Sequence, residues 1–315
     1  HCYELENGLY FDTSTVADYG RLARAATEEG EGRIEQVDGK RHQADFAIWR
    51  KTPPGETRQM EWDSPWGKGA PGWHLECSVM SKALLGMPFD IHTGGIDHRE
   101  IHHPNEIAQN QAICGCGSLT QADNSGARFW MHNNFLIERS GKMSKSSGEF
   151  LRVQLLIDKG YHPLAYRMMC LQAHYRSELE FSWDGLSAAL TRLKRMLIAA
   201  QTLTALVGEA HVIAEVAVTH PKLVPMLDAF DAAMADDLNT PRALTVFEEA
   251  LAMKKVPAEQ KLSLLHVMNA VLGLKLFDLD RTDLRIRPVA ATADEAAIAA
   301  LLDARKTARA EKDFA

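Results

Sequence analysis

The sequence lacks the features that mark membrane, secreted and general polyanion-binding proteins. No apolar run reaches the ~18–20 residues that a membrane span needs, and no charged-then-apolar leader is present. The five cysteines are an odd number in a chain of 315 residues, which favours reduced thiols over a disulfide framework. The net charge is −7, so a general attraction to polyanions is excluded, although a local basic face is not. We therefore expect a cytoplasmic protein without a membrane partner.

What is present is the composition of an ordinary globular protein. Hydrophobic residues make up 46% of the chain and charged residues 24%, and the length allows two or three domains. The first 60 residues combine strand candidates at 8–12 and 44–49 with a polar loop at 30–39. This first stretch therefore reads as strands and turns rather than helices.

Residues 61–140 have the pattern of an α/β fold. A short apolar strand at 89–92 ends in Thr93-Gly94-Gly95, a helix follows from near Pro104, and another strand candidate spans 128–132. A strand, a glycine-rich turn and a helix are the parts from which nucleotide-binding sheets are built. Such units are common, so this pattern alone does not identify a function.

Residues 186–315 have the pattern of a helical bundle. Leucines 186, 190, 193 and 197 share one helix face, and Thr240-Pro241 supplies an N-cap and a first helical position. A further helix is expected after Val256-Pro257, and Thr292 is expected to cap the last one. We read the apolar stripes of these helices as core.

Three residues carry side chains that zinc binds: Cys77, His102 and Glu106. His102 lies just before the helix expected near Pro104 and Glu106 lies in its first turn, so their side chains can converge on one point. Their spacing is not that of a standard zinc motif. A buried structural cysteine with a surface histidine and glutamate is therefore an alternative reading of the same residues.

A second group of chemical interest is the segment 141–148, which contains Lys142 and Lys145 among serines and glycines. A mobile loop of this kind can bring two cations to a phosphate as charge develops on it. A solvated lysine- and serine-rich loop is the alternative. The string Lys142-Met143-Ser144-Lys145-Ser146 favours the first reading, because it resembles the signature loop of class I aminoacyl-tRNA synthetases.

Several longer blocks resemble the cysteinyl-tRNA synthetase family, in that family's order and at its spacing. The two most specific blocks surround Cys77 and Glu106, and the resemblance covers nearly the whole chain. The blocks are Pro71-Gly72-Trp73-His74-Leu75-Glu76-Cys77-Ser78, Asp90-Ile91-His92-Thr93-Gly94-Gly95-Ile96-Asp97, His102-His103-Pro104-Asn105-Glu106-Ile107-Ala108-Gln109, Trp130-Met131-His132-Asn133, Ala173-His174-Tyr175-Arg176-Ser177 and Asp236-Asp237-Leu238-Asn239-Thr240-Pro241.

The resemblance implies a zinc ion held by Cys77, His102 and Glu106, with a fourth ligand upstream of this sequence. In the family the zinc takes the substrate's thiolate, which a soft metal prefers to the hydroxyl of serine. Trp73 and His92 resemble residues that line the amino-acid pocket, and Asp97 is expected to face the substrate cysteine or the adenosine.

The resemblance implies that the lysine loop binds ATP and that Mg²⁺ accompanies the ATP. Lys142 and Lys145 would stabilise charge on the α-phosphate as the cysteine carboxylate attacks it, and Met143, Ser144 and Ser146 complete the ATP-binding loop. The implied function is ATP-dependent ligation of L-cysteine to tRNA(Cys) through a cysteinyl-adenylate. The family is commonly monomeric.

The implied fold is a class I synthetase catalytic domain of Rossmann-like α/β type, here its second half, followed by an all-α helical bundle. On this reading residues 1–60 are an inserted connective segment and 61–140 the second catalytic half. Residues 141–185 are the lysine loop and junction, and 186–315 a tRNA-binding bundle.

The sequence departs from the family pattern in several places. The His-Ile-Gly-His signature and the first zinc cysteine are absent, Ala70 stands where the family has arginine, and Pro104 where it has glutamate. We therefore expect a piece of a longer protein that is inactive alone. Two alternatives stay open: the cysteine ligase of mycothiol synthesis, which joins cysteine to an amino sugar, and a non-catalytic paralogue that binds tRNA or a partner.

Overall fold

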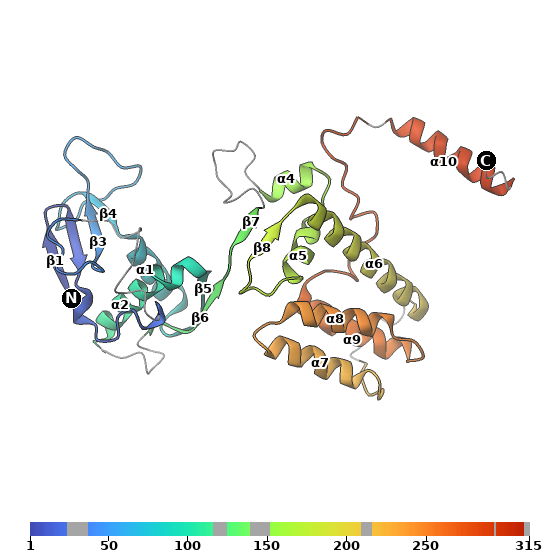
Figure 1. The fold of residues 1–315 in the computed structure, drawn as a ribbon, viewed down its shortest axis with the longest axis horizontal. Helices are drawn as coiled ribbons and strands as arrows, with labels where there is room; N and C mark the ends of the chain where they lie inside the picture. Colours follow the sequence, from blue (N-terminus) through green and yellow to red (C-terminus); the bar gives the residue numbers. More distant parts are fainter. Residues whose placement is uncertain (24–36, 116–124, 139–151, 209–215, 293, 312–315) are drawn as a thin grey trace. The chain divides into compact units, whose positions relative to one another are not determined.

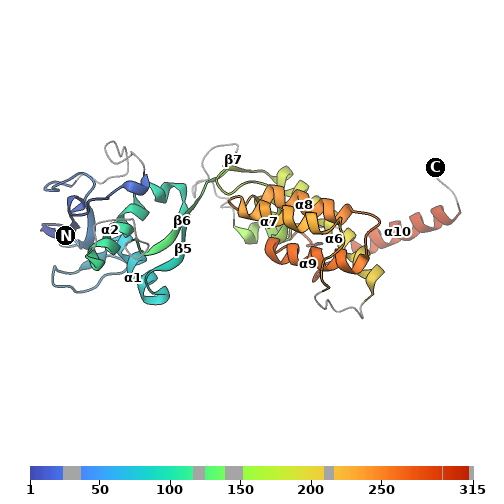
Figure 2. The same cartoon turned by 90° about the horizontal axis from the view of Figure 1, so that it is seen from below.

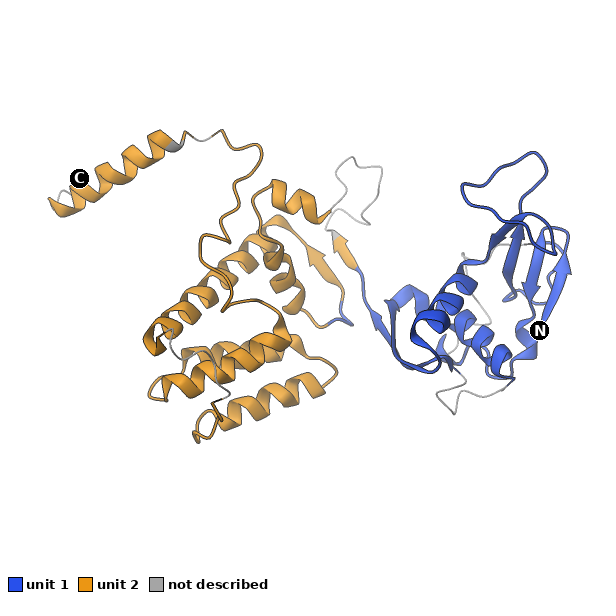
Figure 3. Ribbon diagram, turned by 180° about the vertical axis from the view of Figure 1, so that it is seen from behind, with its two compact units in different colours: residues 1–135, 175–177 blue, residues 136–174, 178–315 orange. Residues whose placement is uncertain are grey.

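The computed structural model describes residues 1–23, 37–115, 125–138, 152–208, 216–292 and 294–311. The chain divides into two compact units, which Figure 3 colours separately. Unit 1 comprises residues 1–135 and 175–177, and unit 2 comprises 136–174 and 178–315. The chain thus has mixed α/β content with many helices. None of the helices in the described ranges is both long and apolar enough to cross a membrane.

Unit 1 begins with a four-stranded antiparallel sheet in the order β1 (Cys2–Leu5), β2 (Gly8–Phe11), β3 (Phe46–Lys51) and β4 (Gly69–Pro71). Strands β2 and β3 confirm the two strand candidates. A Cβ atom on Gly8 would lie 2.1 Å from the Trp49 carbonyl oxygen, so only glycine lets β2 approach β3 there. The sheet continues to Pro71, which pairs with Trp49.

Two helices and a pair of strands follow in unit 1: α1 (Trp73–Leu85), β5 (Phe89–Gly95), α2 (His102–Cys114) and β6 (Ala127–Asn133). Strands β5 and β6 are parallel and lie side by side in both Figure 1 and Figure 2. Three short 3-10 helices, η1 (Thr13–Thr15), η2 (Arg21–Ala23) and η3 (Ile96–Arg99), complete the unit.

Helix α2 is the central element of unit 1. It begins at His102, two residues before the predicted start at Pro104, and ten consecutive residues, His102 to Gln111, are buried. Helix α1 and the short helices η2 and η3 pack against it. A helix buried on every side must place polar side chains in the interior, where they need partners. This requirement brings the histidines and the carboxylate of α2 together with other polar groups.

Unit 2 is mainly helical (Figure 1). Its buried hydrophobic residues form one large core. Its elements are β7 (Leu136–Glu138), α4 (Val153–Asp158), α5 (Pro163–Leu171), β8 (Leu179–Phe181), α6 (Trp183–Val207), α7 (Val224–Ala235), α8 (Thr240–Ala252), α9 (Ala258–Leu272) and α10 (Glu295–Ala310). Leu186, Leu193 and Leu197 are buried and Leu190 packs beside them, as the stripe predicts. Met168 of α5 belongs to the same core.

Two predicted helix caps are wrong by one or two residues. Asn239, not Thr240, caps α8 and accepts a hydrogen bond from the backbone N–H of Arg242. Asp294, not Thr292, caps α10 through the backbone N–H groups of two alanines. Asparagine and aspartate cap at least as well as threonine, so the neighbouring residue takes the position.

The cysteines also differ from expectation. Cys114 is disulfide-bonded, whereas Cys2, Cys77 and Cys170 are free.

Candidate metal centre

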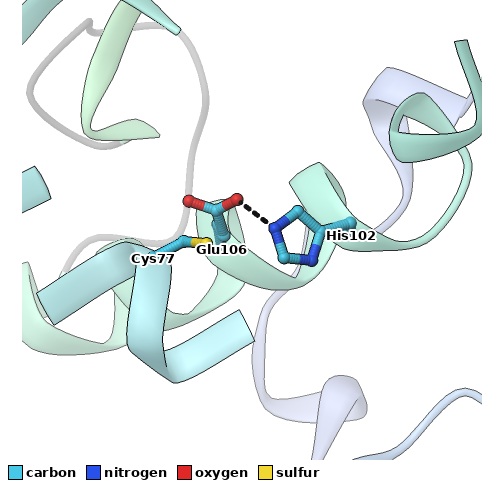
Figure 4. A group of neighbouring side chains, drawn as sticks. All are labelled: Cys77, His102 and Glu106. Carbon is cyan, nitrogen blue, oxygen red and sulfur yellow. Dashed lines mark ion pairs between the residues drawn. The ribbon is translucent and has the colours of Figure 1, made fainter. Parts of the chain in front are cut away.

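Two helices of unit 1 bring the predicted zinc ligands together (Figure 4). Cys77 lies on α1, while His102 and Glu106 lie one turn apart on α2, where residues four positions apart share a face. Candidate ligand atoms of these three residues all lie within 4.8 Å of one another. The thiol, imidazole and carboxylate are a donor set that zinc accepts.

Burial makes the carboxylate of Glu106 the electrostatic centre of this group. Glu106 is 1% exposed, and a buried charge of this kind needs hydrogen-bonding or positive partners. His102 Nε2 lies 2.9 Å and His92 Nε2 3.2 Å from the same oxygen of Glu106. Burial raises the pKa of this carboxyl, but the hydrogen bonds from His102 and His92 and the charges of these rings outweigh it and lower the pKa to about 2.

The pKa of the Cys77 thiol is shifted in the opposite direction and is raised. Burial raises its pKa, and the negative charges of Glu106 and Glu76 raise it further. Without a cation the group is therefore protonated at neutral pH. A divalent ion bound by the three donors would lower the pKa of the thiol, because metal binding and thiol deprotonation are coupled. The three residues fit a zinc ion in donor chemistry, and the buried carboxylate of Glu106 supplies a negative charge that favours a cation.

Each of the two adjacent histidines of α2 is paired with another histidine from outside the helix. His102 Nδ1 lies 2.8 Å from His74 Nδ1, and His103 Nδ1 lies 2.8 Å from His132 Nε2. Burial and repulsion by the neighbouring rings lower the pKa of His74 and of His103 to about 3. These rings are therefore neutral at physiological pH, with a lone pair available as acceptor or ligand.

Two of the residues predicted to contact the substrate cysteine border the metal centre. The ring of Trp73 lies 4.1 Å from that of His102, centroid to centroid, and the residue is 55% exposed. His92 reaches Glu106 from β5. Asp97 lies in η3 and is not grouped with the donor sets found among the described residues. The residues predicted to bind ATP, which are Lys142, Met143, Ser144, Lys145 and Ser146, lie outside the described residues.

Comparison with known proteins now decides the family. Residues 1–191 match the family described as "tRNA synthetases class I (C) catalytic domain". The chain belongs to this class I synthetase family. The relationship is consistent with the resemblance carried by the motifs around Cys77 and Glu106.

Individual synthetases of the family extend the similarity over the rest of the chain. The cysteine–tRNA ligase of Novosphingobium aromaticivorans is 74% identical over 315 residues, which is 100% of this chain and 63% of the relative. The cysteine–tRNA ligase of Zymomonas mobilis is 52% identical over 340 residues, covering 99% of this chain and 65% of the relative. Cysteine–tRNA ligase 1 of Burkholderia lata is 45% identical, covering 100% and 61%. The chain thus spans less than two thirds of these relatives.

Several residues around the candidate metal centre were given no role in it from the sequence. His74, His98, His103, His132 and Trp130 all have rings in contact with the His92 and His102 neighbourhood. A signal was available, because six of the chain's 13 histidines lie between positions 74 and 132. Neutral histidines bury well only when other polar groups face them, so such a density indicates a shared site.

Proposed function

We propose that this chain is the cysteine-selecting part of a cysteine–tRNA ligase. The full-length protein would join L-cysteine to tRNA(Cys) with ATP. The observation that carries the proposal is the convergence of Cys77, His102 and Glu106 within 4.8 Å around a buried carboxylate. The names of the relatives, which are cysteine–tRNA ligases, support the choice of substrate.

Selection of cysteine would depend on the metal centre. When bound by Cys77, His102 and Glu106, a zinc ion supplies a soft Lewis acid that prefers a thiolate to a hydroxyl. His74 holds the imidazole of His102 from its other nitrogen and so fixes the ring's orientation. Trp73 and His92 border the same space and would enclose the side chain of the substrate, with Asp97 facing the amino acid or the adenosine.

The reaction would take place in two steps. The carboxylate of cysteine attacks the α-phosphorus of ATP, so that a carboxylate–phosphate bond forms and pyrophosphate leaves with the bonding electron pair. A hydroxyl of the terminal tRNA ribose then attacks the carbonyl carbon of the adenylate, so that an ester bond forms and AMP leaves with the electron pair of the broken carbon–oxygen bond. The proton of the hydroxyl passes to the solvent. Lys142 and Lys145 would stabilise the charge on the α-phosphate in the first step, in a loop with Met143, Ser144 and Ser146 and with Mg²⁺ on the nucleotide.

We assign the rest of the chain to the parts of such an enzyme. Strands β5 and β6 with α1 and α2 would be the second half of a Rossmann-like catalytic fold, and residues 1–60 an inserted connective segment. Residues 141–185 would be the lysine loop and junction, and 186–315 a bundle that contacts tRNA. We propose a monomer that works in the cytoplasm.

The test uses the full-length protein. We expect about one tightly bound zinc per chain and ATP–pyrophosphate exchange that depends on cysteine and is not supported by serine. Cys77→Ser should lose the zinc and lower exchange by more than ~100-fold, because loss of a direct ligand exceeds the 10–100-fold effect of an outer-shell change. Cys2→Ser is the matched control, since Cys2 is a free, exposed cysteine in the same unit.

Each alternative has its own outcome. A metal-free wild-type protein would contradict the zinc assignment, and a full-length protein without exchange activity would indicate a non-catalytic paralogue. Exchange without transfer to tRNA, but with coupling of cysteine to an amino sugar, would replace the tRNA ligase by the mycothiol enzyme.

A further inference from the structure

A second group of donors lies beside the first and shares one residue with it. Candidate ligand atoms of His92, His103 and Glu106 also lie within 4.8 Å of one another. His103 and Glu106 are each 1% exposed, and the side chain of His92 is 16% exposed. The motif block that contains His103 gives it no role, although it stands directly beside the predicted ligand His102.

His103 is held in the manner of a metal ligand. Ligating histidines almost always donate their second ring N–H to an acceptor, which fixes the tautomer and the orientation of the ring. His103 Nδ1 lies 2.8 Å from His132 Nε2, so the tautomer that donates from Nδ1 leaves the Nε2 lone pair for a cation. His102 has the same arrangement, because its Nδ1 faces His74 at 2.8 Å.

The backbone at Gly94 makes room for this second group. A Cβ atom at position 94 would lie 2.7 Å from His103 Cε1 and 2.7 Å from His98 Nδ1, closer than carbon contacts allow. Gly94 lies on β5, two residues after His92. The strand therefore delivers the imidazole of His92 and, by lacking a side chain two residues later, leaves space for the ring of His103.

We propose that His92, His103 and Glu106 form a second binding site for a divalent cation of the zinc class, joined to the first through the carboxylate of Glu106. A carboxylate has two oxygens and about four lone-pair sites, so Glu106 can serve both positions. Two imidazoles and one carboxylate suit zinc, whereas magnesium and calcium prefer oxygen alone. With no thiolate in the set, the second ion binds more weakly than the first.

Occupation of this second site has a functional consequence, which rests on the proposed function. His92 is assigned to the pocket for the substrate cysteine, and a cation held there would take that space. Excess zinc therefore competes with cysteine. The site would make the enzyme sensitive to free zinc at concentrations above those that fill the first site.

The test is a zinc titration of the metal-depleted full-length protein, with bound zinc measured by a competing chromophoric chelator. We expect two ions in the wild type, of unequal affinity. Cys77→Ser should retain only the weaker ion, and His103→Gln only the tighter one, with the second affinity lowered by at least ~10-fold. His98→Gln is the matched control, because His98 touches the rings of His102 and His103 but belongs to neither donor group, and it should bind two.

The outcomes separate this inference from the proposed function. One ion in the wild type at every zinc concentration, lost in Cys77→Ser, overturns the second site and leaves the first. No ion in the wild type overturns both. Loss of the weaker ion in His98→Gln overturns the assignment to His103. A second test uses only the wild-type protein and so does not depend on whether the variants fold. Excess zinc should raise the apparent KM for cysteine in pyrophosphate exchange without lowering kcat. An unchanged KM contradicts the proposal.

Discussion

At the scale of single residues, Glu106 determines the character of the site. Its carboxylate is almost fully buried and is surrounded by imidazoles, two of which contact one of its oxygens. Such a group is stable only while its neighbours donate hydrogen bonds or a cation replaces them. The stability of the metal-free protein should consequently depend on the protonation states of the histidines around Glu106.

Acid should destabilise the metal-free protein, beginning near pH 6.5. His74 has a pKa of about 3 when folded and 6.5 as its ordinary value, so below pH 6.5 the unfolded chain takes up a proton that the folded chain does not. Stability is therefore full above pH 6.5 and falls on acidification. The lowered pKa of Glu106 acts in the same direction below its ordinary value of 4.5. Each such histidine contributes at most ~1.4 kcal/mol per pH unit.

Urea unfolding at pH 7.5 and 5.5, followed by tryptophan fluorescence in the presence of a chelator, measures this effect. His74→Gln should reduce the pH dependence, because glutamine takes up no proton. A free energy of unfolding that is equal at the two pH values would contradict the prediction.

A second residue-scale prediction concerns Tyr19, whose hydroxyl donates a 2.7 Å hydrogen bond to the Asn105 Oδ1 atom beside Glu106. Asn105 is 1% exposed, so Tyr19→Phe leaves a buried amide oxygen without this partner. We expect a loss of ~1–3 kcal/mol in the free energy of unfolding of unit 1. Tyr161→Phe is the control: Ser187, its partner, is only partly buried, and the loss should be smaller. Equal losses would contradict the argument.

The sequence predicted the ligands Cys77, His102 and Glu106 but not the histidine pairs. Donor type and helix spacing are local properties, and His102 and Glu106 are separated by one turn. The contacts of His74 with His102 and of His103 with His132 join residues 28 and 29 positions apart. Only the packing of α1 and β6 against α2 creates these pairs, and no local pattern encodes that packing.

At the scale of elements, periodicity predicted the helices of unit 2 better than the central helix of unit 1. Helices α6, α8 and α9 each bury one apolar stripe, which the spacing of leucines reveals. Helix α2 is buried on every side and carries polar residues throughout, so it has no stripe. Its existence was predicted from Pro104 as a first helical position, and its central position became visible only in the fold.

Helices α6 and α8 are joined by a bidentate ion pair between Arg192 and Glu248. Arg192 Nε and Nη2 lie 2.9 Å and 2.8 Å from the two carboxylate oxygens. Arg192→Lys keeps the charge but loses the paired geometry, so we expect a loss of ~0.5–1 kcal/mol, limited by the partial exposure of both groups. Lys306→Ala is the control, because its pair with Asp303 is exposed and should contribute less than ~0.5 kcal/mol. Urea unfolding followed by circular dichroism measures both variants.

At the scale of the whole molecule, the two units should respond differently to zinc. Five of the six tryptophans lie in unit 1, namely Trp49, Trp62, Trp66, Trp73 and Trp130, whereas most helical residues lie in unit 2. Fluorescence therefore reports mainly unit 1, and far-ultraviolet circular dichroism mainly unit 2.

We predict that chelation of zinc lowers the fluorescence-detected unfolding temperature and leaves the dichroism-detected one nearly unchanged. A ligand at 100 times its Kd stabilises the unit that binds it by ~2.7 kcal/mol. Cys77→Ser should reduce the difference between loaded and chelated samples to the contribution of the weaker second ion. Equal shifts in both signals would contradict the prediction that zinc stabilises unit 1 without stabilising unit 2.

The short segment from Tyr175 to Ser177 belongs to unit 1, although the chain on both sides of it belongs to unit 2 (Figure 3). Its carbonyl groups accept hydrogen bonds from Asn134: the backbone N–H reaches Tyr175 O at 2.8 Å, and the side-chain amide reaches Arg176 O at 3.0 Å. For protein dissection this means that one cut cannot separate the units intact. A fragment ending at Phe135 loses both acceptors of Asn134, so a minimal version of unit 1 requires residues 175–177 to be grafted back through a short linker.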